Sequence, residues 1–185
     1  LKYNYYSILK LTGYWFALSS FANGIWIVAW LYTFIGVSVF IMLILLVSLI
    51  FLAVNHQLRM KKSPKHINVF VWWPISIYLG WIIVATVANI AAFLVRINWH
   101  VGFLTVQNWT IVMIFAAMLI YILLIIFRNM RGAAVVGIWA LIAIAVKHWG
   151  IQPAIVSAAI ISAVVLIIDI IFNAFTKSNI LRKLK

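Results

Sequence analysis

The feature that most constrains this chain is a series of long apolar runs separated by short polar segments. We place six runs at residues 12–33, 36–55, 68–95, 107–127, 132–147 and 152–175. Most have close to the 20 residues with which an α-helix crosses a hydrocarbon core of about 30 Å. The runs are continuous, whereas membrane strands alternate apolar and polar residues over about 10 positions. The sequence therefore predicts an all-α, polytopic transmembrane bundle of about six helices.

Composition supports a lipid environment for most of the chain. Hydrophobic residues make up 68% of the 185 residues and charged residues 8%, against about 25% charged residues in soluble domains. A soluble fold would lack the polar surface to cover so much apolar surface. We therefore treat residues 1–185 as a single transmembrane domain that ends in a basic tail, 176–185. The run 132–147 is the shortest, so it either crosses with little tilt or is partly re-entrant.

The basic residues indicate how the helices are oriented. Twelve of the 14 lie on one side of the predicted helices: Lys2, Lys10, Arg59, Lys61, Lys62, Lys65, Arg128, Arg131, Lys177, Arg182, Lys183 and Lys185. Only Arg96 and Lys147 lie on the other side. The positive-inside rule then places both termini in the cytoplasm. These residues punctuate apolar runs, so we expect anionic lipid headgroups, and no nucleic acid, as their partners.

Two predicted helices carry polar and aromatic residues along one face. In 12–33 these are Ser19, Asn23, Trp26 and Trp30, and in 68–95 they are Pro74, Tyr78, Trp81, Ala85 and Asn89. Their spacings of three and four residues place each set on one side of its helix. An unpaired amide in hydrocarbon is costly, so Asn23 and Asn89 are expected to face protein.

These faces have two interpretations. The asparagines would form hydrogen bonds between helices, with the tryptophans near helix ends as interfacial anchors: Trp72, Trp99, Trp109 and Trp149. Trp26 and Trp81 lie well inside their helices, however. The alternative is therefore an aromatic box for a flat apolar ligand.

The same residues carry a family resemblance. Ser20-Phe21-Ala22-Asn23-Gly24-Ile25-Trp26 resembles the Leu-Asn-x-x-Trp segment in the third helix of the TspO family. This family is also called the tryptophan-rich sensory proteins, and it includes the mitochondrial translocator, or peripheral benzodiazepine receptor. Its fifth helix has Pro-Tyr, Trp, Ala-Thr and Asn in order, similar to Pro74, Tyr78, Trp81, Ala85-Thr86 and Asn89. The runs 78–91 and 137–142 look closer to a longer bacterial branch.

The resemblance implies how the chain is organised and what it binds. Residues 12–95 would correspond to the family's third to fifth helices and 107–175 to additional helices, with the first two helices expected upstream of Leu1. The family binds porphyrins, cholesterol and benzodiazepine-like drugs, so the implied partner is a tetrapyrrole or other hydrophobic ligand, including a haem-like group. The implied half-pocket is Asn23, Trp26, Trp81, Ala85 and Asn89, to which we add Trp30 and Tyr78 from the same faces. The bacterial branch implies the inner membrane.

One acidic residue, Asp169, lies inside the predicted helix 152–175, with Asn173 on the same face. An intramembrane acid is a functional-site hypothesis by default. Asp169 either pairs with Arg128 or Arg131 near the cytoplasmic side or takes part in transport.

Three functions follow from these patterns. The first is a receptor or transporter-like protein that binds a hydrophobic or tetrapyrrole-like ligand. The second is a structural subunit of a homodimer or larger membrane complex, for which Ala133-x-x-x-Gly137 and Ala154-x-x-x-Ala158 offer close helix contacts. The third is a cation- or proton-coupled carrier that uses Asp169. An enzyme is not expected, because the chain has no cysteine, no metal-ligand cluster and no acid, base or nucleophile at a catalytic spacing.

Overall fold

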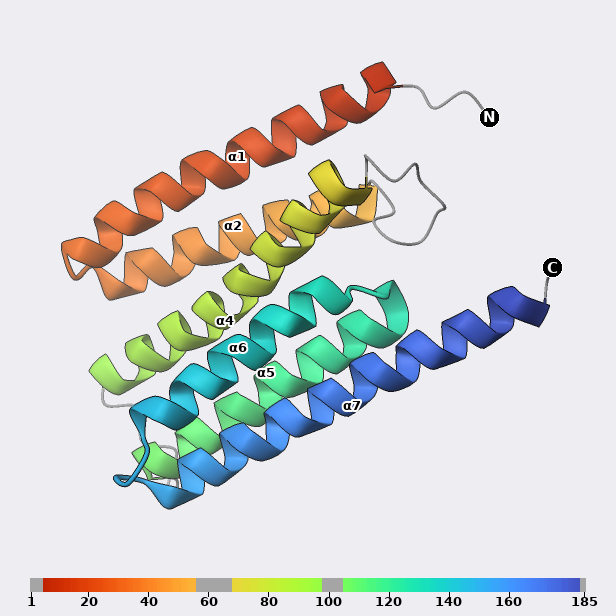
Figure 1. Ribbon diagram of the computed structural model, residues 1–185. Coiled ribbons are helices and arrows are strands. Elements are labelled where there is room, and N and C mark those ends of the chain that lie inside the picture. Colours follow the sequence, from red (N-terminus) through yellow and green to blue (C-terminus); the bar gives the residue numbers. More distant parts are fainter. Residues whose placement is uncertain (1–4, 56–67, 98–104, 184–185) are drawn as a thin grey trace. The chain divides into compact units, whose positions relative to one another are not determined.

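The computed structural model describes the backbone of residues 5–55, 68–97 and 105–183, and the side chains of residues 13–54, 68–97 and 105–176. Figure 1 shows α1 (Tyr5–Leu31), α2 (Ile35–Asn55), a π-helical turn η1 (Asn68–Trp72) that leads into α4 (Trp73–Arg96), α5 (Val106–Arg128), α6 (Arg131–Lys147) and α7 (Pro153–Lys183). These described ranges contain no strand. The predicted all-α fold is confirmed, with six α-helices in these ranges.

Five of these helices are long and apolar enough to cross a membrane. Their spans are Gly13–Leu31, Ile35–Val54, Asn68–Arg96, Val106–Arg128 and Pro153–Thr176. The helix α6 has 17 residues, or about 25 Å at 1.5 Å per residue, slightly less than a hydrocarbon core. The chain is thus a multi-pass membrane protein. The side on which its termini lie stays a prediction, and the basic segments 59–66 and 177–185 lie outside the described side chains.

The helix ends differ from the sequence prediction at both termini of the chain. The first helix begins at Tyr5 rather than at residue 12, and the last continues to Lys183 rather than ending at residue 175. Hydropathy marks only the part of a helix that lies in lipid. Polar residues beyond that part continue the same backbone hydrogen-bond ladder, so a hydropathy boundary falls inside the helix.

The helix-end tryptophans divide between lipid and protein. Trp149 is exposed, as expected of an interfacial anchor, and Trp109 is half-buried. Trp72 is only 4% exposed, and its carbonyl accepts a hydrogen bond from Ser76 Oγ at 2.7 Å. Its predicted position in a lipid-facing belt is therefore wrong, because η1 turns it into the protein. Trp99 lies outside the described residues.

The contacts between helices divide the chain into two compact units, unit 1 (Leu1–Trp99) and unit 2 (His100–Lys185). In unit 1, α2 is central: it packs against α1 on one side and α4 on the other. The Cα atoms of α1 and α4 nowhere approach within 8 Å in the described ranges. The two helices are therefore joined through α2 and do not pack directly against each other.

The end of this three-helix layer is fixed at the turn between α1 and α2. Thr33 adopts a left-handed conformation with φ of 59°, which is uncommon for a β-branched residue. Arg96, at the end of α4, donates from Nη1 to the Thr33 carbonyl at 2.7 Å. This bond joins the turn between α1 and α2 to the C-terminal end of α4, 63 residues further along the chain.

In unit 2, the helices α5, α6 and α7 all pack against one another. The turn between α5 and α6 is made by Asn129, which has φ of 52° and accepts a hydrogen bond from Arg131 Nε at 3.1 Å. Gly137 of α6 lies against the buried ring of Tyr121, so close that a Cβ atom there would be 2.5 Å from Cε2. Small residues thus allow α5 and α6 to approach closely.

Candidate ligand site

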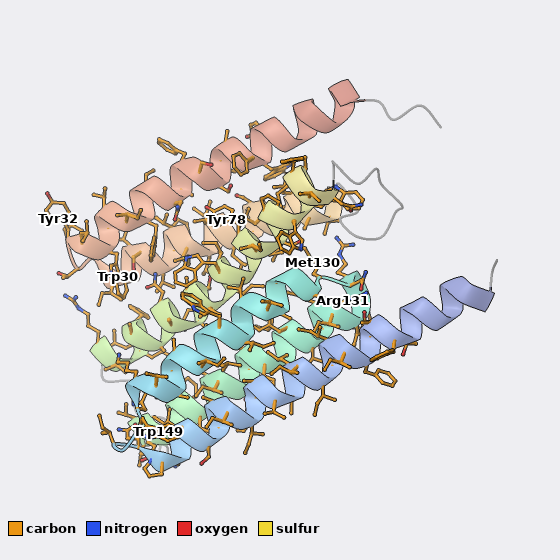
Figure 2. All side chains as sticks on the ribbon, viewed as in Figure 1. Trp30, Tyr32, Tyr78, Met130, Arg131 and Trp149 are labelled. Atoms are coloured by element: carbon orange, nitrogen blue, oxygen red, sulfur yellow. The ribbon has the colours of Figure 1, made fainter. Side chains whose placement is uncertain are left out.

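The polar-aromatic face of α1 is only partly in contact with protein. Ser19 is fully buried, and its hydroxyl donates to the Phe16 carbonyl at 2.8 Å. Asn23 and Trp26 are half-buried. The rings of Trp26 and Trp30 stack with centroids 6.2 Å apart and planes at 28°. The predicted helical spacing therefore forms a continuous face, with Trp30 exposed at its end (Figure 2).

A cavity of about 350 Å³ lies between this face and α4. It is lined by Phe16, Ser20, Asn23, Pro74, Ile75 and Tyr78. Figure 2 labels Tyr78 on α4. Of the predicted site residues, Asn23 and Tyr78 are the two that this cavity brings together. Its volume lies at the lower end of the range for small-molecule pockets, about 300–1,000 Å³.

Three buried polar atoms in unit 1 have no hydrogen-bond partner among the residues that the structure describes. They are the Trp26 indole Nε1, the Tyr78 hydroxyl and the Asn89 amide Nδ2. The Ser19 side chain lies beside the Tyr78 hydroxyl. An indole or amide nitrogen can only donate, and a phenol hydroxyl can do so. Because most buried polar groups in proteins are satisfied, these donors call for an explanation.

Asn89 lies at the interface of α4 with α2 rather than on the cavity wall. It is 2% exposed, and its Oδ1 accepts a hydrogen bond from the Ser38 hydroxyl at 3.0 Å. The expectation that Asn89 faces protein is confirmed. The hydrogen bond to its oxygen therefore links α4 to α2, while its Nδ2 has no acceptor among the described residues.

Trp81 and Ala85 do not line the cavity. Trp81 is 43% exposed and Ala85 is half-buried. Trp81 lies three residues beyond Tyr78, as Trp26 lies three beyond Asn23. Both steps correspond to about 4.5 Å along a helix. The two tryptophans therefore continue the same two helix faces beyond the cavity.

Sequence reasoning missed three of the residues that line the cavity: Phe16, Ser20 and Ile75. Phe16 and Ser20 lie seven and three residues before Asn23 on the same side of α1. Phe16 lies one turn before Ser19, where the predicted face began, and Ser20 lies next to Ser19, so a face longer by one turn and slightly wider would have included both. The partner of Asn89 was also missed. Ser38 lies on the most apolar helix, where nothing in the sequence singles out one serine.

In unit 2, the structure places the predicted ion-pair residues separately. The Oδ2 atom of Asp169 and the Nη2 atom of Arg128 are both buried, and neither has a hydrogen-bond partner in the described part of the chain. Arg131 instead donates from Nε to Asn129. The residue of α7 that does bond α5 is Asn173, whose Nδ2 donates to the Ile125 carbonyl at 3.5 Å.

The described residues offer no cluster for metal chemistry. Within them, no group of three His, Asp or Glu side chains could hold a metal ion, and the sequence has no cysteine. The donors and aromatic rings of unit 1 can bind and orient a molecule, and they include no pair of groups suited to acid–base or nucleophilic chemistry.

Comparison with known proteins assigns the family. The model of the TSPO-like protein family matches residues 2–172, a range that runs from unit 1 into α7 of unit 2. The chain therefore belongs to the TSPO-like family. No curated protein and no solved structure matches the chain.

Proposed function

We propose that this TSPO-like membrane protein is a receptor or transporter-like protein for an apolar ligand that binds in the cavity between α1 and α4. The observation that carries the proposal is that two polar residues from different helices, Asn23 of α1 and Tyr78 of α4, line the same cavity. The Asn23 amide can donate a hydrogen bond to a ligand oxygen. The Tyr78 hydroxyl is buried beside the Ser19 side chain, and a rotation that turned it toward a ligand oxygen would add a hydrogen bond that contributes about 0.5–1.5 kcal/mol.

The ligand would be flat, apolar and able to accept hydrogen bonds. Asn23 and Tyr78 would orient its polar end, and the aromatic faces of Trp26 and Trp81 would cover the part that extends past the cavity. A tetrapyrrole with carboxylate side chains has this combination of surfaces, and it is the ligand class that the sequence resemblance implies.

The test is the quenching of tryptophan fluorescence by protoporphyrin IX in detergent-solubilised protein. Tyr78→Phe keeps the ring but removes the donor, so we expect the Kd to rise roughly 10-fold, the equivalent of about 1.4 kcal/mol. The control is Tyr32→Phe, because Tyr32 is exposed at the end of α1 (Figure 2). Equal affinity in Tyr78→Phe and wild type would remove Tyr78 from the proposed site.

A second candidate, a structural subunit of a larger membrane complex, is favoured by a different observation. An apolar groove of about 320 Å³ lies between α6 and α7 in unit 2, with Ala145, Ala159 and Ala163 among its lining residues. Small residues allow another helix to approach closely. Stoichiometric co-purification of a partner that is lost in Ala163→Phe would support this function over the first.

A further inference from the structure

Asp169 is the only acidic residue in a chain with 14 lysine and arginine residues, and none of the four whose side chains the structure describes, Arg96, Arg128, Arg131 and Lys147, bonds its buried oxygen. Its Oδ2 atom is inaccessible to solvent and has no hydrogen-bond partner among the described residues. An ionised carboxylate without a partner in a membrane interior is very costly. The carboxylate of Asp169 therefore needs a positive partner or a bound proton.

The nearest arginine along α5 lies at a different depth. The contact between Asn173 Nδ2 and the Ile125 carbonyl, at 3.5 Å, shows which residues of α5 and α7 lie at the same level; the two helices run in the same direction within unit 2 (Figure 1). Asp169 lies four residues before this level and Arg128 three residues after it, a separation of about 10 Å along the helix axes. Arg128 Nη2 is itself without a partner among the described residues.

Asn173 supplies a second unsatisfied oxygen one helical turn from Asp169. Its Nδ2 donates to the Ile125 carbonyl, and its Oδ1 is buried without a partner in the described ranges. Side chains four residues apart on a helix have Cβ atoms about 5–6 Å apart. Both free atoms are acceptors, so they cannot satisfy one another. A positively charged atom held between them would satisfy both.

Among the described side chains, the surroundings leave this role open. The other titratable or charged residues on the helices packed against α7 are Tyr121 and Arg128 of α5 and Arg131 and Lys147 of α6. Arg131 bonds Asn129, and Lys147 lies at the opposite end of α6. Tyr121 is buried at the level of Asp169, four residues before Ile125.

We propose that Asp169 and Asn173 form a binding site for a monovalent cation, either a proton that the carboxyl group shares with the Asn173 carbonyl or a sodium ion that both oxygens coordinate. A proton on Asp169 would donate to Asn173 Oδ1 and remove the buried charge. Sodium would remove the same charge by direct coordination. This site lies in unit 2 and does not depend on the ligand site of unit 1.

The test uses the full chain in detergent micelles. Thermal unfolding is compared in sodium chloride and choline chloride at equal ionic strength, and infrared spectra at neutral pH without sodium report a protonated carboxyl group. For a sodium site, we expect sodium to raise the Tm of the wild type, and Asp169→Asn and Asn173→Leu to abolish the shift. For a proton site, we expect a protonated-acid carbonyl band that Asp169→Asn removes and Asn173→Leu shifts.

Ser162→Ala is the matched control. Its hydroxyl is also buried without a partner among the described residues, but it lies seven residues from Asp169 on the same helix. Ser162→Ala should keep the sodium shift or the acid band. The proposal is overturned if the wild type shows neither signal, or if Ser162→Ala removes the signal as completely as Asn173→Leu does. The wild-type measurements decide the first point even if a variant does not fold.

Discussion

The two units of this protein differ in packing and in the chemistry of their unsatisfied groups. In unit 1, α1 and α4 are separated by a cavity, and the three buried atoms without partners among the described residues can all donate hydrogen bonds. In unit 2, all three helices pack together, and the unsatisfied atoms are mixed. Trp109 Nε1, Arg128 Nη2 and Ser162 Oγ can donate, whereas Asp169 Oδ2 and Asn173 Oδ1, one turn apart on α7, accept. This pair of acceptors has no counterpart in the described part of unit 1, which is why we propose a cation on α7 and an acceptor-bearing apolar ligand in unit 1.

Alanine substitutions at two glycines, one in each unit, should show the largest difference in stability. A Cβ at Gly137 would lie 2.5 Å from the Tyr121 ring, whereas a Cβ at Gly24 of α1 would meet no atom within 4 Å. We expect Gly137→Ala to lower the free energy of unfolding by about 1–3 kcal/mol through overpacking. Gly24→Ala should be neutral or stabilise the helix by up to about 1 kcal/mol.

Thermal or denaturant unfolding of the two purified variants measures this contrast. An equal loss of stability in both would mean that α1 is packed as closely as α6, and the comparison of the units would fail.

A smaller effect is expected from the hydrogen bond between α2 and α4. Ser38→Ala removes the donor to Asn89 Oδ1, and interhelical hydrogen bonds in membranes contribute on average about 0.6 kcal/mol and at most about 1.7 kcal/mol. Ser48→Ala is the matched control, because Ser48 is on the same helix and its hydroxyl donates to the Ile44 carbonyl within that helix. If both variants unfold at the same Tm, the bond between Ser38 and Asn89 does not stabilise unit 1.

Hydropathy was sufficient to predict the fold class and the six α-helices of the described ranges, because lipid requires long apolar segments that satisfy their own backbone hydrogen bonds. It could not predict the helix ends at Tyr5 and Lys183, since these lie beyond the apolar spans. The spacing of Asn23 and Tyr78 predicted faces that do meet at a cavity.

Spacing could not show which neighbouring helix each residue of α4 contacts. The structure shows that Asn89 bonds Ser38 of α2 and that Trp81 is exposed rather than enclosed in the cavity. For Asp169, the sequence predicted Arg128 or Arg131 as a partner but could not show the depth of these residues relative to the carboxylate. The register of α5 and α7 depends on tertiary packing, which places Arg128 about 10 Å away along the helix axes.

The most direct test exchanges the same residue type in each unit, Asn23→Leu on α1 and Asn173→Leu on α7, and measures both properties of each variant. Asn23→Leu is predicted to weaken the quenching by protoporphyrin IX and to leave the sodium shift or acid band as in the wild type. Asn173→Leu is predicted to alter the cation signal and to leave protoporphyrin affinity unchanged. If both variants change the same property, or if neither changes any, the two units do not hold separate sites.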